Sequence, residues 1–193
     1  MSEDVIQRYR ALLTRVVERK SEVDRFADFL EAETSWLTSP ASTRFHLAEE
    51  QGLLKHSVGV CEMLLHVKPF TRPEINDESC VIVGLFHDVG KVGYPRNPLY
   101  VPNPNRREVE RGIRYSYNPN VTKMGLAVRS LYLIAQYVPL TEEEAQAITY
   151  HDGQYIDENK IVAHFERPLT LLVHFADMWT ATIGERSGTD GRG

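Results

Sequence analysis

Two side chains of metal-binding type stand next to each other where an apolar run ends. His87 and Asp88 follow residues 81–86, Val-Ile-Val-Gly-Leu-Phe, and Gly90 and Lys91 come directly after them. Burying an unpaired charge is costly, so Asp88 requires a cation or hydrogen-bond donors beside it. An imidazole, a carboxylate and a lysine so close together indicate a metal site with a cation that faces a phosphate group.

Two further positions supply the partners that such a site needs. His56 lies on a predicted helical face that is otherwise apolar, and Asp177 interrupts the apolar residues 171–179. Taken singly, each residue has a structural explanation. His56 could donate a hydrogen bond to a backbone carbonyl, and Asp177 could form a salt bridge to an arginine. Taken together with the His87-Asp88 pair, the two residues favour one shared metal ion, because neutral imidazole is the commonest metal ligand among side chains.

The order of these residues resembles that of a known family. A histidine, a histidine-aspartate pair and a distant aspartate on a late helix are the motif of the HD-domain metal-dependent phosphohydrolases. This chain has them as His56, His87, Asp88 and Asp177, and the residues around the first two motifs, 52–57 and 85–91, are close to their usual forms. The resemblance covers about residues 45–185. It implies an all-α bundle in which these four ligands converge from separate helices on a central divalent metal.

Two details refine the resemblance. Several branches of the family use a histidine near the position of His151 for a second metal or for the substrate phosphate, whereas a histidine that ends a helix is equally explained by the helix dipole. The branch that hydrolyses guanosine polyphosphate alarmones has a glutamate-aspartate pair near Lys91, and this chain lacks it. The dinuclear phosphodiesterases need more histidine ligands between the His87-Asp88 pair and Asp177 than this chain is expected to offer at His151 and elsewhere. We therefore predict one metal ion, with Lys91 on a phosphate oxygen.

The ligand types predict the chemistry. Two histidines and two aspartates favour one divalent transition metal (Mn, Fe, Co, Ni or Zn), with Mg as a further candidate. Such an ion lowers the pKa of its bound water and polarises a phosphoryl group, while Lys91 neutralises the charge that develops on the phosphate oxygens. The sequence leaves the proton acceptor open among Asp88, His151 and Asp152, which together with Lys91 form the predicted catalytic set.

Helical spacing of apolar residues predicts an all-α, single-domain bundle. The expected helices span residues 5–17, 21–40, 52–67, 76–90, 124–137, 141–151 and 168–184, with no sustained alternating strand pattern. We expect Ser21 to cap the second helix, Pro69 and Pro73 to end the third, and Thr141 to open a capping box. Residues 1–40 form an N-terminal helical pair that packs on a core of residues 41–186, and residues 187–193 form a disordered tail.

A long irregular loop is predicted at residues 93–123. It holds five of the ten prolines and four of the nine tyrosines. Because such a loop in a compact domain is usually functional, and because tyrosine and arginine suit a base and a phosphate, we expect it to contact substrate. The alternative is a proline-stiffened surface loop with solvated arginines. The predicted substrate-binding residues are Lys91, Arg106, Arg107, Arg111, Arg114, Tyr115 and Tyr117.

Composition limits the class of protein. The 193 residues are 42% hydrophobic and 25% charged, which is ordinary for a globular domain. The formal net charge of −5 argues against a general nucleic-acid binder. The acidic N-terminus, the absence of a long apolar run and the presence of only Cys61 and Cys80 predict a soluble cytoplasmic protein without a membrane span or a disulfide framework.

Three functions stay open at this point. The first is a nucleotidase or nucleoside triphosphate hydrolase acting on a small (deoxy)nucleotide, with no stable nucleic-acid complex and with association into a homo-oligomer left open. The second is a 3′→5′ exoribonuclease or phosphodiesterase, since residues 52–56 also resemble the HD domain of bacterial exoribonucleases. The third is a non-catalytic HD regulatory module, which would have no physical need for four buried metal-binding side chains.

Overall fold

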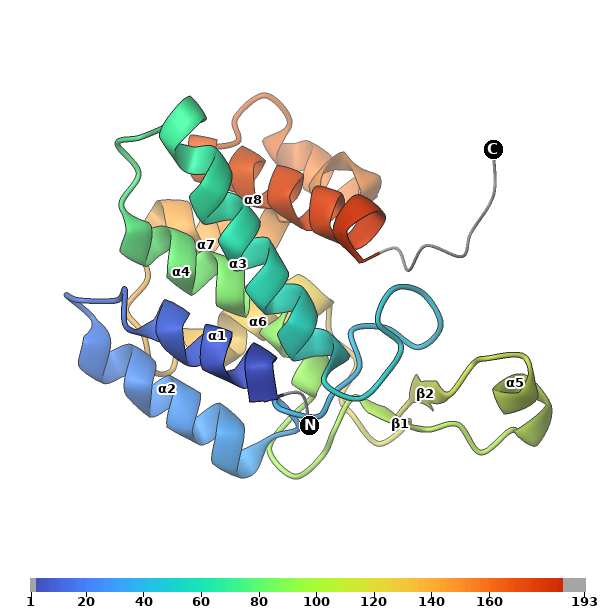
Figure 1. Cartoon of the computed structure of the whole chain (residues 1–193). Coiled ribbons are helices and arrows are strands. Elements are labelled where there is room, and N and C mark those ends of the chain that lie inside the picture. Colours follow the sequence, from blue (N-terminus) through green and yellow to red (C-terminus); the bar gives the residue numbers. More distant parts are fainter. Residues whose placement is uncertain (1–2, 186–193) are drawn as a thin grey trace.

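The computed structural model describes residues 3–185, and their fold is all-α, as predicted (Figure 1). A two-stranded sheet is the only sheet in this part of the chain. The α-helices are α1 (Glu3–Leu13), α2 (Lys20–Glu33), α3 (Gly52–Thr71), α4 (Asp77–Phe86), α5 (Arg106–Glu110), α6 (Leu126–Ile134), α7 (Glu142–Tyr150) and α8 (Pro168–Trp179). The 3₁₀ turns are η1 (Val89–Val92), η2 (Gly153–Tyr155) and η3 (Asp157–Val162), and the π-helical turn η4 (Thr180–Gly184) follows α8. The predicted disordered tail, 187–193, lies outside the described residues.

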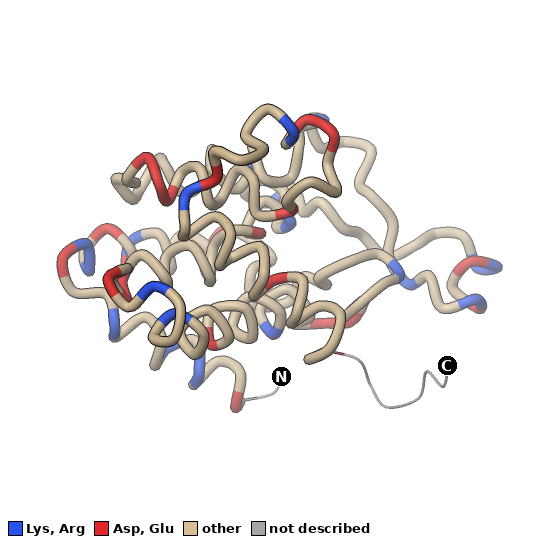
Figure 2. The backbone as a smooth tube through the Cα atoms, turned by 90° about the horizontal axis from the view of Figure 1, so that it is seen from above, with Lys and Arg blue, Asp and Glu red and all other residues tan. Residues whose placement is uncertain are grey.

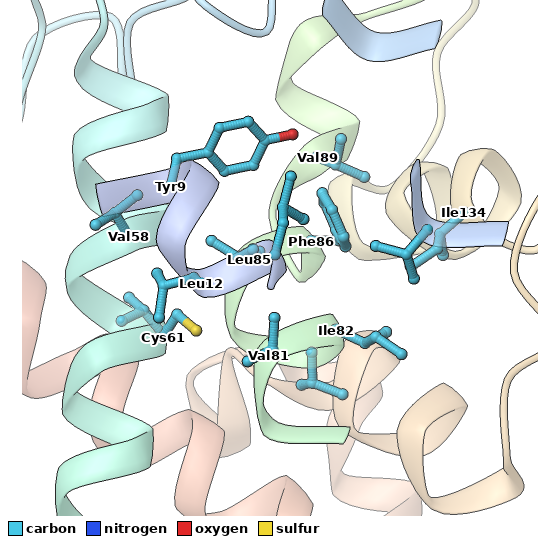
Figure 3. Close-up of a cluster of buried hydrophobic side chains, with 14 of the residues drawn as sticks. Tyr9, Leu12, Val58, Cys61, Val81, Ile82, Leu85, Phe86, Val89 and Ile134 are labelled. Atoms are coloured by element: carbon cyan, nitrogen blue, oxygen red, sulfur yellow. The ribbon is translucent and has the colours of Figure 1, made fainter. Parts of the chain in front are cut away.

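Helix α4 is the centre of the bundle. Its residues from Glu78 to Phe86 are all buried, as expected for a helix that is apolar on every side. It packs against α3 and α7, and Figure 3 shows Ile82 and Phe86 among side chains from α1, α3 and α6. Burying a side chain such as Phe86 contributes roughly 1.5–3 kcal/mol. The end of α4, which carries His87 and Asp88, is therefore held firmly by the core.

The N-terminal helical pair shares this core. Tyr9, Phe26 and Leu30 belong to the same buried cluster as α3 and α4. Arg19, between α1 and α2, donates to Glu78 of α4 at 2.7 Å and to Glu144 of α7 at 2.7 Å. The pair is thus joined to the two helices that flank the candidate site by ionic contacts as well as by apolar packing.

Several predicted helix boundaries are confirmed and others are wrong, among them the expected end of the second helix near Pro40, because α2 ends at Glu33. Thr141 caps α7 in a capping box, and Asn76 caps α4 through Ser79. Ser21 does not cap α2, because Arg19 occupies the cap position through its contacts to Glu78 and Glu144, and α2 already begins at Lys20. Pro69 does not end α3, which continues to Thr71.

The segment predicted as a loop contains a small hairpin. Strand β1 (Tyr100–Pro102) pairs antiparallel with β2 (Tyr115–Tyr117), with Val101 opposite Ser116, and the short α5 lies between the strands. We call residues 100–117 the arm, because Figure 1 shows them projecting from the helical body. Strands of three residues are too short to give a recognisable alternating pattern, which is why the sequence did not reveal them.

No helix in the described part of the chain is long and apolar enough to span a membrane.

Candidate metal centre

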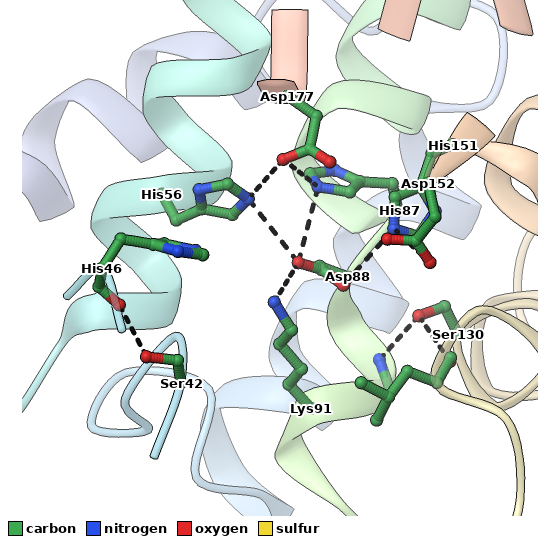
Figure 4. Close-up of polar contacts among 12 residues, drawn as sticks. Ser42, His46, His56, His87, Asp88, Lys91, Ser130, His151, Asp152 and Asp177 are labelled. Atoms are coloured by element: carbon green, nitrogen blue, oxygen red, sulfur yellow. Dashed lines mark hydrogen bonds and ion pairs between the residues drawn. The ribbon is translucent and has the colours of Figure 1, made fainter. Parts of the chain in front are cut away.

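The end of α4 brings two adjacent side chains to one place. Neighbouring residues of a continuous helix point about 100° apart. Helix α4 ends at Phe86, and Asp88, with φ −104° and ψ 9°, starts the 3₁₀ turn η1. Gly90 allows this turn to lie against α6: its N–H donates to Ser130 Oγ at 2.8 Å, and a Cβ there would meet Leu126 O at 2.4 Å. The change of helix type lets the side chains of His87 and Asp88 face the same cluster (Figure 4).

The four predicted ligands converge. His56 Nε2, from α3, lies 3.0 Å from Asp177 Oδ1 of α8 and 3.5 Å from Asp88 Oδ2. His87 Nε2 lies 3.7 Å from Asp88 Oδ2 and 4.0 Å from Asp177 Oδ1. We call these four residues the metal cluster. The ligand atoms of His56, His87 and Asp88 all lie within 4.8 Å of one another, and Asp177 forms a second group of this spacing with His87 and His151, so the spacing suits a shared ion.

His151 joins the metal cluster at its edge. Its Nε2 lies 3.6 Å from Asp88 Oδ1, and with His87 and Asp177 it forms a second potential ligand group. His151 is also the C-cap residue of α7. Its position therefore agrees with both predictions made from the sequence, a role in the site and a favourable interaction with the helix dipole. Asp152 follows it with a half-exposed carboxylate, 3.8 Å from His151 Nε2.

Hydrogen bonds from the far ring nitrogens orient the three imidazoles. His87 Nδ1 donates to Gly84 O at 3.0 Å and His151 Nδ1 donates to Ile148 O at 2.8 Å. His56 Nδ1 lies 2.9 Å from Glu185 Oε1. Such bonds fix the ring orientation, so that Nε2 of each histidine faces the cluster, as in metal sites where a carbonyl or carboxylate holds the non-ligating nitrogen.

The positive charge that balances the carboxylates of the cluster comes from protons on His56 and His151, as the pKa values of the histidines show. Burial lowers the pKa of His87 to about 4. Burial acts in the same direction on His56 and His151, but the carboxylates of Asp177 and Glu185 raise the pKa of His56 to about 9, and Asp88 raises that of His151 to about 9. A divalent cation can replace such protons, because metal binding requires deprotonated ligands.

The donor set fits a divalent metal ion. His87 Nε2 is fully buried and has no hydrogen-bond partner among the described residues. A buried polar atom without a partner costs roughly 1–3 kcal/mol, and a metal ion would satisfy it. Imidazole nitrogens mixed with carboxylate oxygens favour first-row transition metals over a purely oxygen site. The described residues can therefore hold such an ion.

Lys91 lies beside the metal cluster. Its ammonium lies 2.5 Å from Asp88 Oδ2, and its side chain is only 12% exposed. Burial disfavours the charge, but Asp88 more than compensates and raises the pKa of Lys91. Lys91 and His151 in turn hold the pKa of Asp88 well below its usual range against the effect of burial. Lys91 is thus a permanent cation beside the metal ligands.

Two residues near the metal cluster were not predicted from the sequence. Glu185 accepts from His56, and His46 Nε2 lies 4.0 Å from Glu185 Oε2. With His56 they form a further group that could hold an ion. His46 lies in an irregular segment and Glu185 follows η4, so neither interrupts an apolar helical face. The sequence offered no pattern from which to find them.

The predicted substrate-binding residues of the arm lie apart from the metal cluster. Tyr115 and Tyr117 are in β2, where they pair with β1, and the ring of Tyr117 packs on Tyr100 with centroids 5.4 Å apart. The arginines lie in the part of the arm beyond the two strands, where basic and acidic residues intermix (Figure 2); they are Arg106, Arg107, Arg111 and Arg114. The arm residue that relates to the site is Tyr100, which is 7% exposed. Burial raises its pKa, and Tyr117 and Asp88 add to this effect.

Comparisons with known proteins add no family assignment. No protein-family model, curated protein or solved structure matches the chain.

Proposed function

We propose that this chain is a metal-dependent phosphohydrolase of the HD type that hydrolyses a phosphate ester or anhydride of a small (deoxy)nucleotide. The observation that carries the proposal is His87 Nε2, which is buried without a hydrogen-bond partner between the carboxylates of Asp88 and Asp177. A structural ion pair has no use for such an atom, whereas a metal ion binds it.

The roles of the residues follow from their positions. His56, His87, Asp88 and Asp177 would hold one divalent transition metal ion, Mn, Fe, Co, Ni or Zn. Bound there, it would supply Lewis-acid activation of water and of the phosphoryl group. The four ligands come from α3, the end of α4 and α8, so the bundle core fixes their separation.

Lys91 and Asp152 complete the proposed mechanism. Lys91, already cationic and beside Asp88, would hold a phosphate oxygen and offset the negative charge that develops during attack. Asp152 has a side chain that is 45% exposed, against 5% for Asp88, and it is not among the four ligands. It is therefore the carboxylate best placed to accept a proton from attacking water, with His151 between it and Asp88.

A small substrate is favoured over a polymer by the overall charge. The formal net charge of −5 would repel a long polyanion, while a local cation such as Lys91 suffices for one phosphate group. Cys61 and Cys80 are both buried free thiols, which suits the reducing cytoplasm where nucleotides are abundant.

The experiment is a screen of nucleoside mono- and triphosphates with each divalent metal, with a short single-stranded RNA as the competing substrate. Release of phosphate or triphosphate from a nucleotide supports the proposal, and release of mononucleotides from RNA would support the exoribonuclease instead. Asp152→Asn should lower kcat while metal content stays at the wild-type level. No hydrolysis with any metal or substrate would overturn the proposal and favour the non-catalytic module.

A further inference from the structure

Arg129 in α6 is a buried cation without a counterion. The residue is 4% exposed, and one of its guanidinium nitrogens, Nη2, donates to Thr122 O at 2.6 Å. A second guanidinium nitrogen, Nη1, is buried and has no hydrogen-bond partner within residues 3–185. No carboxylate in this range forms an ion pair with it. Arg19, the other arginine enclosed by the bundle, shows the contrast, because Glu78 and Glu144 both neutralise it.

This arrangement is energetically unfavourable for a purely structural residue. Burial lowers the pKa of Arg129 and no neighbouring carboxylate opposes the effect. A guanidinium nevertheless stays protonated in proteins, so the charge remains. Buried charges are normally paired, and an apolar side chain of similar size would usually be at least as stable at such a position. An anion that binds next to Arg129 would supply the missing partner.

A cavity of about 290 Å³ lies beside this side chain. The residues that line it are Tyr94, Asn97, Val121, Thr122, Met124, Arg129 and Tyr132. The rings of Tyr94 and Tyr132 are stacked, with centroids 6.3 Å apart and planes at 18°, and their hydroxyls lie 3.2 Å apart. Tyrosine faces and a methionine thioether are suitable neighbours for a planar apolar group.

The wall of the cavity is held in place by its own hydrogen bonds. Tyr94 and Asn97 exchange two backbone hydrogen bonds, of 3.0 and 2.9 Å. The Asn97 side chain donates to Asn120 O at 3.2 Å and accepts from Asn118 at 2.9 Å. The amide of Asn97 is therefore used by the wall, and Arg129 is left as the group that can recognise charge. A preformed wall reduces the entropy that binding would cost.

We propose that this cavity binds a small oxyanion with a planar apolar body, such as an aromatic carboxylate or phosphonate. The guanidinium of Arg129 pairs with the oxyanion, and the body lies against the tyrosines and Met124. The site is distinct from the metal cluster, since none of the cluster's ligands lines the cavity. The cavity and the metal cluster are joined structurally through Gly90, which follows Asp88 by two residues. The N–H of Gly90 donates to Ser130, the neighbour of Arg129 in α6.

Isothermal titration calorimetry with phenylphosphonate and benzoate tests this site, in the presence of a chelator. Benzamide serves as the neutral probe with the same ring, and inorganic phosphate as the anion without a ring. We expect the wild type to bind both aromatic anions better than either control probe. Arg129→Met should weaken the binding by about 10- to 100-fold, the range expected for hydrogen bonds to a charged group. Arg25→Met, at an exposed arginine of α2, is the matched control and should bind as the wild type does.

The same titration separates this site from the metal cluster. A folded Asp88→Asn variant, which keeps the size of the side chain, should bind phenylphosphonate as tightly as the wild type, and loss of binding in that folded variant would overturn the proposal. Melting temperatures identify a folding defect: Arg129→Met should melt at or above the wild-type temperature, because it removes an unpaired buried charge. If Arg129→Met fails to fold, Arg129→Lys is tested instead. The lysine variant should bind the aromatic anions more weakly than the wild type, because it lacks the guanidinium. Binding as tight as that of the wild type in a folded lysine variant would contradict the proposal. Equal binding of benzoate and benzamide by the wild type would also overturn it.

Discussion

The arm begins only twelve residues after Asp88 of the metal cluster, yet the arm and the cluster are built in opposite ways. The cluster takes its ligands from α3, the end of α4 and α8, and His56 and His87 are almost completely buried. The arm is a local structure whose hydrogen bonds join nearby residues, such as Asn103 to Glu108. A site assembled from distant segments requires the whole fold, whereas the hydrogen bonds of the arm close within one short segment. The chemistry should therefore be sensitive to single changes in the cluster and tolerant of changes in the arm.

Asp88→Ala should have the largest effect. It removes a proposed metal ligand and also leaves Lys91 as a buried cation without its partner, and breaking a buried ion pair costs roughly 3–5 kcal/mol. We expect loss of metal retention and of phosphohydrolysis, checked by metal analysis and by the nucleotide screen. Asp157→Ala, at an exposed carboxylate paired with Lys160, is the control and should keep both. Full activity in Asp88→Ala would show that the cluster is not the metal site.

The junction between the two regions offers a matched pair of glycines. Gly93, with φ +85°, directly follows η1, and a Cβ there would meet Leu99 N at 2.4 Å and Asn97 O at 2.5 Å. Gly112, in the arm, has φ +89° but nothing within 4 Å of a Cβ. Gly93→Ala combines backbone strain with overpacking and should destabilise by about 3 kcal/mol, while Gly112→Ala carries only the backbone strain of about 1 kcal/mol.

Chemical denaturation measures this difference. The midpoint of unfolding should fall clearly for Gly93→Ala and little for Gly112→Ala, with equal denaturant slopes. Equal losses of unfolding free energy in the two variants would mean that Gly112 in the arm is packed as tightly as Gly93 beside η1. Such a result would contradict the difference between the two regions.

Metal addition should distinguish the regions at a smaller energy. An ion that binds only the native state stabilises by about 2.7 kcal/mol at one hundred times its dissociation constant. For a chain of this length that corresponds to a rise of roughly 5–10 °C in melting temperature. Thermal unfolding with and without Mn²⁺ or Co²⁺ checks the shift, which a chelator should reverse. Gly112→Ala should show the same shift and Asp88→Ala none.

The difference between the regions also explains what the sequence could predict. His56 and Asp177 were found because each interrupts an apolar helical face, and such faces report the core directly. His46 and Glu185 interrupt no pattern, so only the three-dimensional structure brings them to His56.

Tertiary contacts set the boundaries that local rules missed. The start of α2 depends on the pairing of Arg19 with Glu78 and Glu144, which lie 59 and 125 positions further along the chain. The strands of the arm could not be recognised because three residues give no periodicity. Local signals such as the Thr141 capping box involve only neighbours, and these were predicted correctly.

The arm itself is predicted to have the smallest effect. Replacing its four arginines, Arg106, Arg107, Arg111 and Arg114, by glutamine removes four positive charges that lie apart from the metal cluster. If the arm contributes to substrate binding, it does so over a distance, by attracting an anionic nucleotide, and such attraction is screened by salt. We expect KM to rise about 3-fold at low ionic strength and the rise to vanish at high salt, with kcat, metal content and melting temperature unchanged. A fall in kcat would mean that an arm arginine reaches the reacting phosphate, and an unchanged KM at low salt would leave the arm as a solvated surface hairpin.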